Sequence, residues 1–478
     1  MSLNGKARKG VLWSLAQQAS IQGINLLVQL FLMRLLTPSD FGIIALITVF
    51  ISLGNVIVEG GLTSSLIRSK ELDIEDYSSV FLLNLFLSLF LYFLIFVSAP
   101  FISIFYGEPS LKAIIRTFGV VLIIKALAAI QVTKFTRDLN FKIQFIINLP
   151  SVIVGGVVGL LSALNGFGVW SLVFMALCQS LVSMILSWQV SDLAIKWSFN
   201  FEKIKGHFSF GYKLALSSSL NIIFQNIYNI IIGKAFNTQI LGFYNRAELL
   251  SGLPSQNLSL AINKVTFPLF SKLQDSNTEL ASVYKKVMQA SIMATAPTMI
   301  VLLLFADDIF WILFGDKWNS SIPYFKLLCI SSIIYPLQGF NLNILSVKGR
   351  TDLYLRLEVL KKIIILLGVF ISLSYGIYGL IYFQLIFSLV AFFINSYYAG
   401  SLIGYSVMNQ ITDIVPIILI SVLAGFACYI FKHFVPLHGL LLSFISLLVF
   451  VILYLVLGLV FQLKLFKRVF TLAKHLIV

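Results

Sequence analysis

Long apolar stretches recur along the whole chain, and they constrain its fold more than any other feature. An apolar run of about 20 residues can cross a bilayer as an α-helix. Of the 478 residues, 59% are hydrophobic and only 11% are charged, against about a quarter charged in soluble proteins. The sequence therefore predicts an all-α polytopic membrane protein with fourteen transmembrane helices. The predicted spans lie near residues 12–34, 41–58, 79–98, 112–131, 145–164, 168–190, 210–235, 244–268, 285–305, 321–345, 357–375, 378–398, 412–431 and 439–461.

The net charge of +15 would suggest nucleic-acid binding in a soluble protein, but here topology explains most of it. Cytoplasmic segments of membrane proteins carry an excess of Lys and Arg. With fourteen spans and a cytoplasmic N-terminus, 23 of the 34 Lys and Arg residues fall on the inner side and three on the outer side. We therefore expect a multi-pass protein with both termini in the cytoplasm and no nucleic-acid partner.

The chain also contains an internal repeat. A shift of 200 positions places Arg34 on Lys234 and Gly42 on Gly242, both within an apolar segment, a short loop and a second apolar segment. Weaker matches follow in the same order at offsets of 208, 214 and 211, including Phe105 to Glu108 with Leu313 to Asp316. Repeats of this kind are common in transporters, where they enclose a site at mid-membrane.

The repeat predicts two pseudo-symmetric six-helix lobes followed by two further helices. We assign residues 1–190 to the N-terminal lobe, 191–208 to a cytoplasmic linker, 209–400 to the C-terminal lobe, and 401–478 to the last two helices and a cytoplasmic tail. The linker mixes basic and aromatic residues, which suits either a segment at the anionic inner leaflet or a plain solvated connection.

Eight cations lie inside predicted spans, where few acidic residues accompany them. A basic residue at the centre of a transmembrane helix costs about 2.5 to 3.5 kcal/mol on insertion scales. Eight would cost on the order of 20 kcal/mol, which exceeds a typical folding free energy of about 5 to 15 kcal/mol. We therefore expect a polar interior that accepts an anionic cargo, although cations near span ends can also extend to the interface. These residues are Arg34, Arg116, Lys125, Lys213, Lys234, Arg246, Lys264 and Lys326.

Amide side chains form matching stripes on the first and seventh spans. Gln22, Asn25 and Gln29 share one helical face, and Gln225 and Asn229 continue an equivalent stripe. Amides facing lipid would lose their hydrogen bonds, so these stripes predict either contacts between helices or contacts with substrate. Arg and Lys neutralise phosphate, and amides suit hydroxyl groups, so the pattern favours a ligand that combines phosphate with sugar.

Enzymatic motifs are absent from the sequence. The four His residues have no spacing that would build a triad or a metal site, and a P-loop is missing. Gly155, Gly156 and Gly159 form a small-residue stripe that is typical of close helix packing. We expect no enzyme activity, no metal and no cofactor beyond a counter-ion.

Two short segments resemble a known family. They are Leu35 to Gly42 (LLTPSDFG) and Leu241 to Ala247 (LGFYNRA), the latter followed by Pro254 and Pro268. Together they are similar to the polysaccharide transporter branch of the multidrug/oligosaccharidyl-lipid/polysaccharide (MOP) exporter superfamily, in particular to flippases of O-antigen and colanic-acid type.

The resemblance implies a V-shaped, MATE-like pair of lobes in the bacterial inner membrane. It implies translocation of undecaprenyl-pyrophosphate-linked oligosaccharide repeat units by alternating access, for O-antigen, capsule or exopolysaccharide synthesis. Basic positions that match the family's pyrophosphate contacts are Arg34, Arg246 and Lys264. The resemblance also implies H⁺ or Na⁺ as counter-ion, for which the few carboxylates Glu59, Glu248 and Asp40 are candidates.

The partners expected on this basis are the lipid-linked oligosaccharide, membrane lipids, a polysaccharide polymerase and chain-length machinery, with the protein itself a monomer. Two other functions remain open on the sequence. A multidrug or small-cation antiporter of the same fold would need an anionic cavity. A membrane polysaccharide polymerase would need a large external loop, and the longest outer loops, near 99–111 and 306–320, are short.

Overall fold

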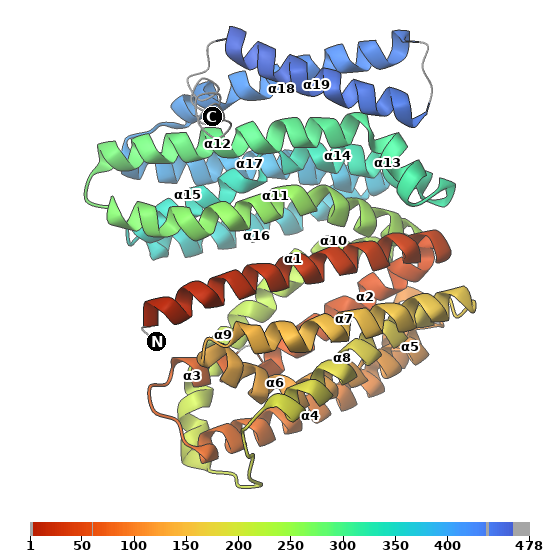
Figure 1. The fold of residues 1–478 in the computed structure, drawn as a ribbon, viewed down its shortest axis with the longest axis vertical. Helices are drawn as coiled ribbons and strands as arrows, with labels where there is room; N and C mark the ends of the chain where they lie inside the picture. Colours follow the sequence, from red (N-terminus) through yellow and green to blue (C-terminus); the bar gives the residue numbers. More distant parts are fainter. Residues whose placement is uncertain (1–2, 60, 436–438, 462–478) are drawn as a thin grey trace. The chain divides into compact units, whose positions relative to one another are not determined.

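The computed structural model describes residues 3–59, 61–435 and 439–461, and these residues form helices without any β-strand (Figure 1). Their contacts divide the chain into two compact units, residues 1–245 and 246–478. Unit 1 contains α1 (Leu3–Leu35), α2 (Pro38–Glu59), α3 (Leu62–Arg68), α4 (Ile74–Tyr106), α5 (Leu111–Phe118), α6 (Val120–Arg137), α7 (Phe141–Leu164), α8 (Trp170–Val190), α9 (Phe201–Gln225) and α10 (Ile227–Ala235). The predicted all-α fold is confirmed.

Helix α11 (Thr238–Lys272) carries residues of both units. Unit 2 continues with α12 (Asn277–Leu304), α13 (Ala306–Leu313), the short 3₁₀ helix η1 (Asp316–Ser321), α14 (Ile322–Ser332), α15 (Tyr335–Val347), α16 (Thr351–Leu373), α17 (Gly376–Ile403), α18 (Val407–Phe434) and α19 (Leu440–Val460). The predicted cytoplasmic tail after residue 461 lies outside the described residues.

Ten helical segments of the described chain are long and apolar enough to cross a membrane. The segments of the fourteen predicted spans that do not qualify are α1, the α9 and α10 pair, α11 and α16. Each of these is helical, but amides, prolines or charges lower its apolarity; α16, for example, carries Arg356, Glu358, Lys361 and Lys362. The count of fourteen therefore stays a prediction.

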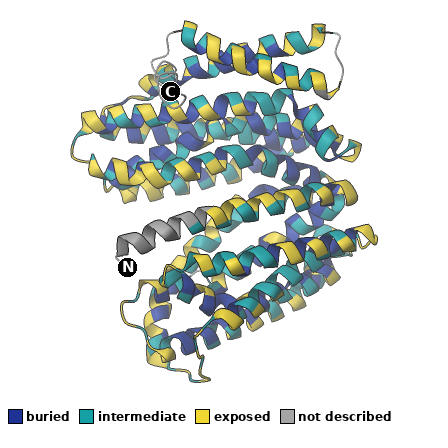
Figure 2. Cartoon of the chain, viewed as in Figure 1, coloured by how far each residue is buried: buried dark blue, intermediate teal, exposed yellow. Residues whose placement is uncertain are grey.

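Many large apolar side chains are exposed, and Figure 2 shows exposed residues along the helices of both units. Phe370 of α16 is 80% exposed and Phe101 of α4 is 70% exposed. Apolar surface on this scale is rare on soluble monomers and marks a face that contacts an apolar medium. The exposed residues therefore agree with the sequence in indicating a multi-pass membrane protein.

Local sequence explains where individual helices begin and end. Asp73 caps the start of α4 by accepting from the backbone N–H of Asp76, whose side chain accepts from the N–H of Asp73 in return. The same helix ends at Gly107, which has φ 67°, a left-handed conformation that glycine adopts without strain. Gly315, which the repeat pairs with Gly107, also has a positive φ of 81°.

Small residues let α7 and α8 approach closely in unit 1. A Cβ placed on Gly155 would lie 2.9 Å from the backbone oxygen of Met175, and one on Gly159 would lie 3.0 Å from the Met175 Cβ. Gly156 faces Val28 of α1 in the same way, at 2.7 Å. The glycine stripe thus packs helices together, as the sequence predicted.

The positions that the repeat relates by 200 residues touch each other at the start of α2 and of α11. A Cβ placed on Gly42 would lie 1.7 Å from the carbonyl oxygen of Thr238, and one on Gly242 would lie 1.8 Å from that of Pro38. Ser39 Oγ and Thr238 Oγ1 are 2.6 Å apart and share a hydrogen bond. The backbones of α2 and α11 therefore cross in direct contact at positions that the repeat makes equivalent.

Helix α9 packs against α2, α3 and α4 of unit 1. In the repeat, α9 is the counterpart of α1 and would belong to the second bundle. In the structure, residues 201–245 instead make their contacts within unit 1. The predicted linker ends inside this helix, whose first two turns are residues 201–208. The lobe boundaries that the repeat predicts, 1–190 and 209–400, therefore stay a prediction.

Unit 2 has a polar centre within its helix bundle. The Tyr284 hydroxyl of α12 donates to Asn341 Oδ1 of α15 at 2.7 Å, and Asn341 Nδ2 donates to Ser396 Oγ of α17 at 3.0 Å. Gln410 of α18 donates to the backbone oxygen of Ser396 at 3.3 Å. All four side chains are buried, so these bonds join four helices where water is excluded.

The close crossing of α2 and α11 predicts that one added methyl group at Gly42 will destabilise the protein. Gly42→Ala should lower the melting temperature of the purified protein, because overpacking against backbone costs about 1 to 3 kcal/mol. Gly206→Ala in α9 is the matched control, since its Cβ would meet nothing within 4 Å and alanine favours helix by up to about 1 kcal/mol. Equal melting temperatures for the two variants would show that the backbones are not in contact.

Candidate functional site

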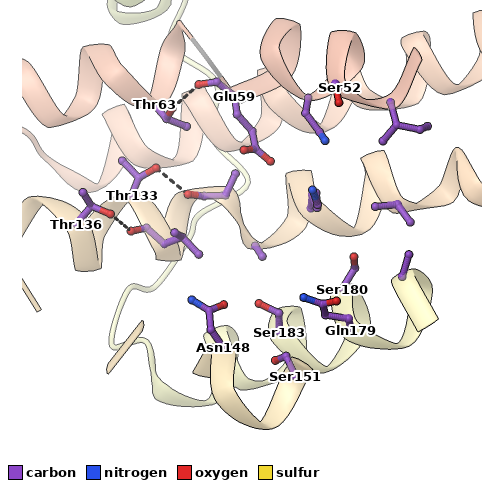
Figure 3. Close-up of a pocket in the computed structure, with 18 of the residues that line it drawn as sticks. Ser52, Glu59, Thr63, Thr133, Thr136, Asn148, Ser151, Gln179, Ser180 and Ser183 are labelled. Atoms are coloured by element: carbon purple, nitrogen blue, oxygen red, sulfur yellow. Dashed lines mark hydrogen bonds between the residues drawn. The ribbon is translucent and has the colours of Figure 1, made fainter. Parts of the chain in front are cut away.

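Unit 1 contains a cavity of about 580 Å³ among its membrane-spanning helices. Thirteen of its 21 lining residues have polar side chains, although the surrounding helices are apolar (Figure 3). The polar residues of the wall are Thr48, Ser52, Asn55, Glu59, Thr63, Lys125, Thr133, Thr136, Asn148, Ser151, Gln179, Ser180 and Ser183. A cavity of this size falls within the range of about 300 to 1,000 Å³ that is typical of small-molecule sites.

The cavity is built from one polar stripe on each of several helices. On α2, Thr48, Ser52, Asn55 and Glu59 follow one another at steps of four, three and four residues, so they share one face. Helix α7 contributes Asn148 and Ser151, and α8 contributes Gln179, Ser180 and Ser183. Figure 3 shows side chains from α2 and from α7 and α8 directed toward the same space.

Most hydroxyl groups of the wall already donate their proton to a backbone carbonyl. Thr48 donates to the carbonyl of Ile44 at 2.7 Å, Thr133 to that of Ala129 at 2.7 Å, and Ser151 to that of Ile147 at 2.6 Å. Thr136 donates to the carbonyl of Val132 at 2.9 Å, and Thr63 of α3 donates to that of Glu59 at the end of α2. Thr133 and Ser151 are buried, and Thr136 also accepts from Gln144 at 2.8 Å. Thr48 and Thr63 therefore present acceptor oxygens to the cavity.

Glu59 and Lys125 are the two charged groups of the wall. Glu59 ends α2 and is half-buried, while Lys125 of α6 is more exposed and its charge acts on the Glu59 carboxylate. Opposite charges in one site offset each other, so the cavity carries no surplus charge of either sign. The structure thus brings together one predicted substrate cation and one predicted coupling carboxylate.

Three of the other intramembrane cations contact groups of the protein. Lys234 Nζ donates to the carbonyl of Phe105 near the end of α4 at 2.5 Å. Arg116 Nε donates to the carbonyl of Phe96 at 3.2 Å, with its guanidinium 4.1 Å from the centre of the Phe96 ring. Lys326 forms an ion pair with Asp307 at 2.7 Å. Their positions explain how these charges are accommodated, and the substrate roles of Lys234 and Arg116 stay predictions.

The basic residues that the resemblance linked to pyrophosphate occupy different environments. Arg34 lies in the last turn of α1 and is exposed, and Lys264 of α11 is exposed as well. Arg246 is buried, with 8% of its surface exposed. A guanidinium is seldom buried without a specific role, so Arg246 is the candidate of greatest interest among the three.

The other candidate residues are placed as follows. Asp40 accepts from the backbone N–H and the hydroxyl of Thr37, at 2.8 and 2.7 Å, and so caps the start of α2. Glu248 accepts from Gln384 at 3.4 Å. Asn229 is buried between Asn226 and Asn245, a contact within the protein. Gln22 and Gln225 are exposed, and Asn25 and Gln29 are half-buried.

Sequence reasoning missed the amides and hydroxyls of the cavity. A signal was present in α2, whose polar residues repeat with the same spacing that identified the stripe of the first span. The contributions of α7 and α8 gave no comparable signal, because two or three polar residues per helix are ordinary. Their convergence depends on packing that a single sequence does not show.

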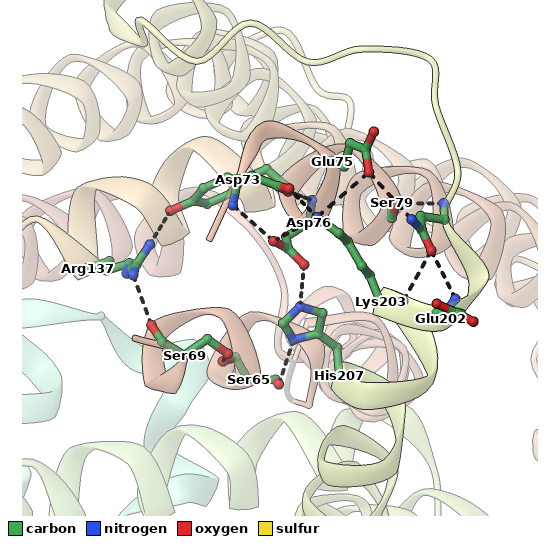
Figure 4. Close-up of polar contacts among 12 residues, drawn as sticks. Ser65, Ser69, Asp73, Glu75, Asp76, Ser79, Arg137, Glu202, Lys203 and His207 are labelled. Atoms are coloured by element: carbon green, nitrogen blue, oxygen red, sulfur yellow. Dashed lines mark hydrogen bonds and ion pairs between the residues drawn. The ribbon is translucent and has the colours of Figure 1, made fainter. Parts of the chain in front are cut away.

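A second polar cluster ties the start of α9 to α3 and α4 (Figure 4). Lys203 pairs with Asp73 and, at 3.5 Å, with Asp76. His207 lies between Ser65 and Asp76, with Nδ1 2.8 Å from Ser65 Oγ and Nε2 3.4 Å from Asp76 Oδ1. A hydrogen bond from the Lys203 ammonium holds the pKa of the Asp73 carboxyl well below its usual range. The cluster clamps α9 onto unit 1.

The fold defines the class of this protein, the multi-helix membrane proteins that share the fold of two solved structures. The structure superimposes on the lipid II flippase MurJ in an inward closed conformation with a TM-score of 0.73, covering 95% of this chain and 99% of that one at 15% identity. An inward-facing multidrug resistance MATE family transporter gives a TM-score of 0.61, covering 79% and 94% of the two chains at 16% identity.

The chain belongs to the family described as polysaccharide biosynthesis protein, whose model matches residues 31–323. The resemblance inferred from the sequence is thereby confirmed. Related proteins include the succinoglycan biosynthesis transport protein ExoT of Rhizobium meliloti, 25% identical and covering 70% of this chain and 67% of the relative. Lipopolysaccharide biosynthesis protein WzxC of Escherichia coli is 23% identical over 78% and 76% of the two chains.

The clamp predicts a local change in stability. Lys203→Gln should raise amide hydrogen exchange in residues 201–210, because Asp73 and Asp76 lose their cation, whereas Lys205→Gln, at an exposed position of the same turn, should not. Because the pKa of Asp73 is lowered, the stability that this carboxylate adds is fully present at pH values above its ordinary pKa of about 3.9. That stability is lost only as the pH falls below this value. Asp73 is thus charged at pH 7, and equal exchange in the two variants at this pH would contradict the assignment.

Proposed function

We propose that this protein is a flippase that moves undecaprenyl-pyrophosphate-linked oligosaccharide repeat units across the bacterial inner membrane by alternating access. The cargo would serve O-antigen, capsule or exopolysaccharide synthesis. The observation that carries the proposal is a cavity lined by polar residues of membrane-spanning helices in a chain of the polysaccharide biosynthesis family. Named relatives act in the synthesis of such polymers, and one carries the word transport in its name.

The charge of the cavity favours this function over the export of cationic drugs. A cation antiporter needs surplus negative charge where its substrate binds, and Lys125 offsets Glu59 here. A polymerase is disfavoured for another reason: the relatives with informative names include transport proteins, and the cavity wall has no nucleophile paired with a base. In this proposal the protein makes and breaks no covalent bond.

The remaining parts of the proposal concern orientation, coupling and partners. The charge distribution supports cytoplasmic termini, and the transport step would draw on H⁺ or Na⁺, with Glu59 or Glu248 as the coupling group. The product, a lipid-linked repeat unit on the outer leaflet, is the substrate that a polymerase and chain-length machinery would consume. Nothing in the proposal needs more than a monomer.

Translocation in vesicles tests the function directly. Inside-out vesicles that contain the protein should withdraw a labelled undecaprenyl-pyrophosphate oligosaccharide from a membrane-impermeant reagent, and protein-free vesicles should not. Arg246→Ala should abolish this withdrawal at unchanged protein level, and Arg246→Lys should retain part of it, because lysine keeps the charge without the bidentate fork. Unchanged accessibility with the wild-type protein would refute the function. Loss of protein from the membrane in both variants would assign Arg246 to folding.

Coupling is tested at Glu59. Glu59→Gln keeps the shape of the side chain but cannot exchange a proton, so translocation should become independent of an imposed pH gradient. Glu248→Gln provides the comparison, since Glu248 is another of the candidate carboxylates and lies outside the cavity wall. If the Glu59 variant responds to the gradient as the wild type does, Glu59 is not the coupling group.

A further inference from the structure

We infer that the unit 1 cavity binds the uncharged sugar portion of the cargo, and that the pyrophosphate binds elsewhere. The inference rests on the proposed function for its physiological ligand, but its chemistry follows from the cavity wall alone. It assigns the site to hydroxyl-rich rings and excludes phosphate.

The charge of the wall does not match pyrophosphate. Pyrophosphate carries several negative charges, and its oxygens accept hydrogen bonds but cannot donate them. The wall holds a single cation, Lys125, whose charge acts on the Glu59 carboxylate beside it. Thr48 and Thr63 donate to backbone carbonyls, so they present acceptor oxygens rather than donors. Most of the charge of a pyrophosphate in this cavity would therefore stay unpaired, which is costly where apolar helices surround it.

A sugar hydroxyl matches the same wall, because it donates one hydrogen bond and accepts others. The acceptor oxygens of the exposed Thr48 and the half-buried Thr63 can receive its proton. Donors come from Lys125 and from the amides of Asn55, Asn148 and Gln179, which form no hydrogen bond to other described residues. These amides lie on α2, α7 and α8, so a ligand would be held from three sides.

The apolar part of the wall suits a sugar as well. Phe118 of α5 presents the one aromatic ring of the wall, and Ala128, Ala129 and Ala176 leave room beside the polar stripes. A sugar ring has apolar C–H faces that pack on such surfaces while its edges form hydrogen bonds. The mixture is typical of pockets with a few convergent polar groups on an apolar background.

Saturation-transfer NMR on the full-length protein in nanodiscs tests the inference. The probes are methyl glucopyranoside and the methyl glycoside of N-acetylglucosamine, with inorganic pyrophosphate as competitor. We expect saturation transfer to at least one glycoside, unchanged by a tenfold excess of pyrophosphate. The signal should fall at least fivefold in Gln179→Leu and in Asn148→Leu, and it should persist in Gln189→Leu, which makes the same change at an exposed position of α8.

Each outcome of this experiment either supports or overturns the sugar site. Displacement by pyrophosphate, absence of transfer to both glycosides, or equal signals in Gln179→Leu and Gln189→Leu would overturn the inference. Thermal melting of every variant separates lost binding from lost folding, and Asn55→Leu on α2 replaces any variant that fails to fold. Glycoside binding without translocation in vesicles would refute the flippase and leave the sugar site standing, so the two failures can be told apart.

Discussion

Hydrogen-bond satisfaction within the bilayer is the constraint on which the rest of this structure depends. Lipid offers no partner to a polar group, so each one has to be satisfied by the protein or by a water-filled space. The hydroxyls of the unit 1 cavity meet this demand by donating to their own helices, and the polar centre of unit 2 meets it through bonds between helices, as Tyr284 does with Asn341. In the cavity, acceptor oxygens such as that of Thr48 stay available to a ligand. In the polar centre of unit 2, the side chains use their donors and acceptors on one another.

The same constraint explains the intramembrane cations, which the sequence presented as one group. Lys234 and Arg116 donate to backbone carbonyls of α4, and Lys326 pairs with a carboxylate. These contacts lower the cost of burying charge without involving a substrate. A functional reading is therefore strongest for Lys125, which lines the cavity, and for Arg246, which is buried in α11.

The sequence predicted the helical membrane fold and the glycine packing, because apolar length and residue size act locally. It also identified the repeat, and the contact of Gly42 with the segment of Gly242 supports it. It did not predict the cavity, although Lys125 and Glu59 were both candidates. Convergence of polar residues from α2, α6, α7 and α8 depends on how these helices are rotated against one another, and no periodicity within one helix contains that information. The contacts of α9 with unit 1 escaped prediction for the same reason.

Separation of charge contacts from sugar contacts has a consequence for specificity under the proposed function. Every lipid-linked repeat unit of this class carries the same pyrophosphate, so its contacts cannot distinguish one polymer from another. Discrimination has to come from groups that meet the sugar. In the cavity, the exposed Thr48 is already bonded within its own helix, so exchanging it for alanine changes the ligand's partners more than it changes the fold. A wall of this kind can be altered to accept a new sugar while the helices that carry it stay the same.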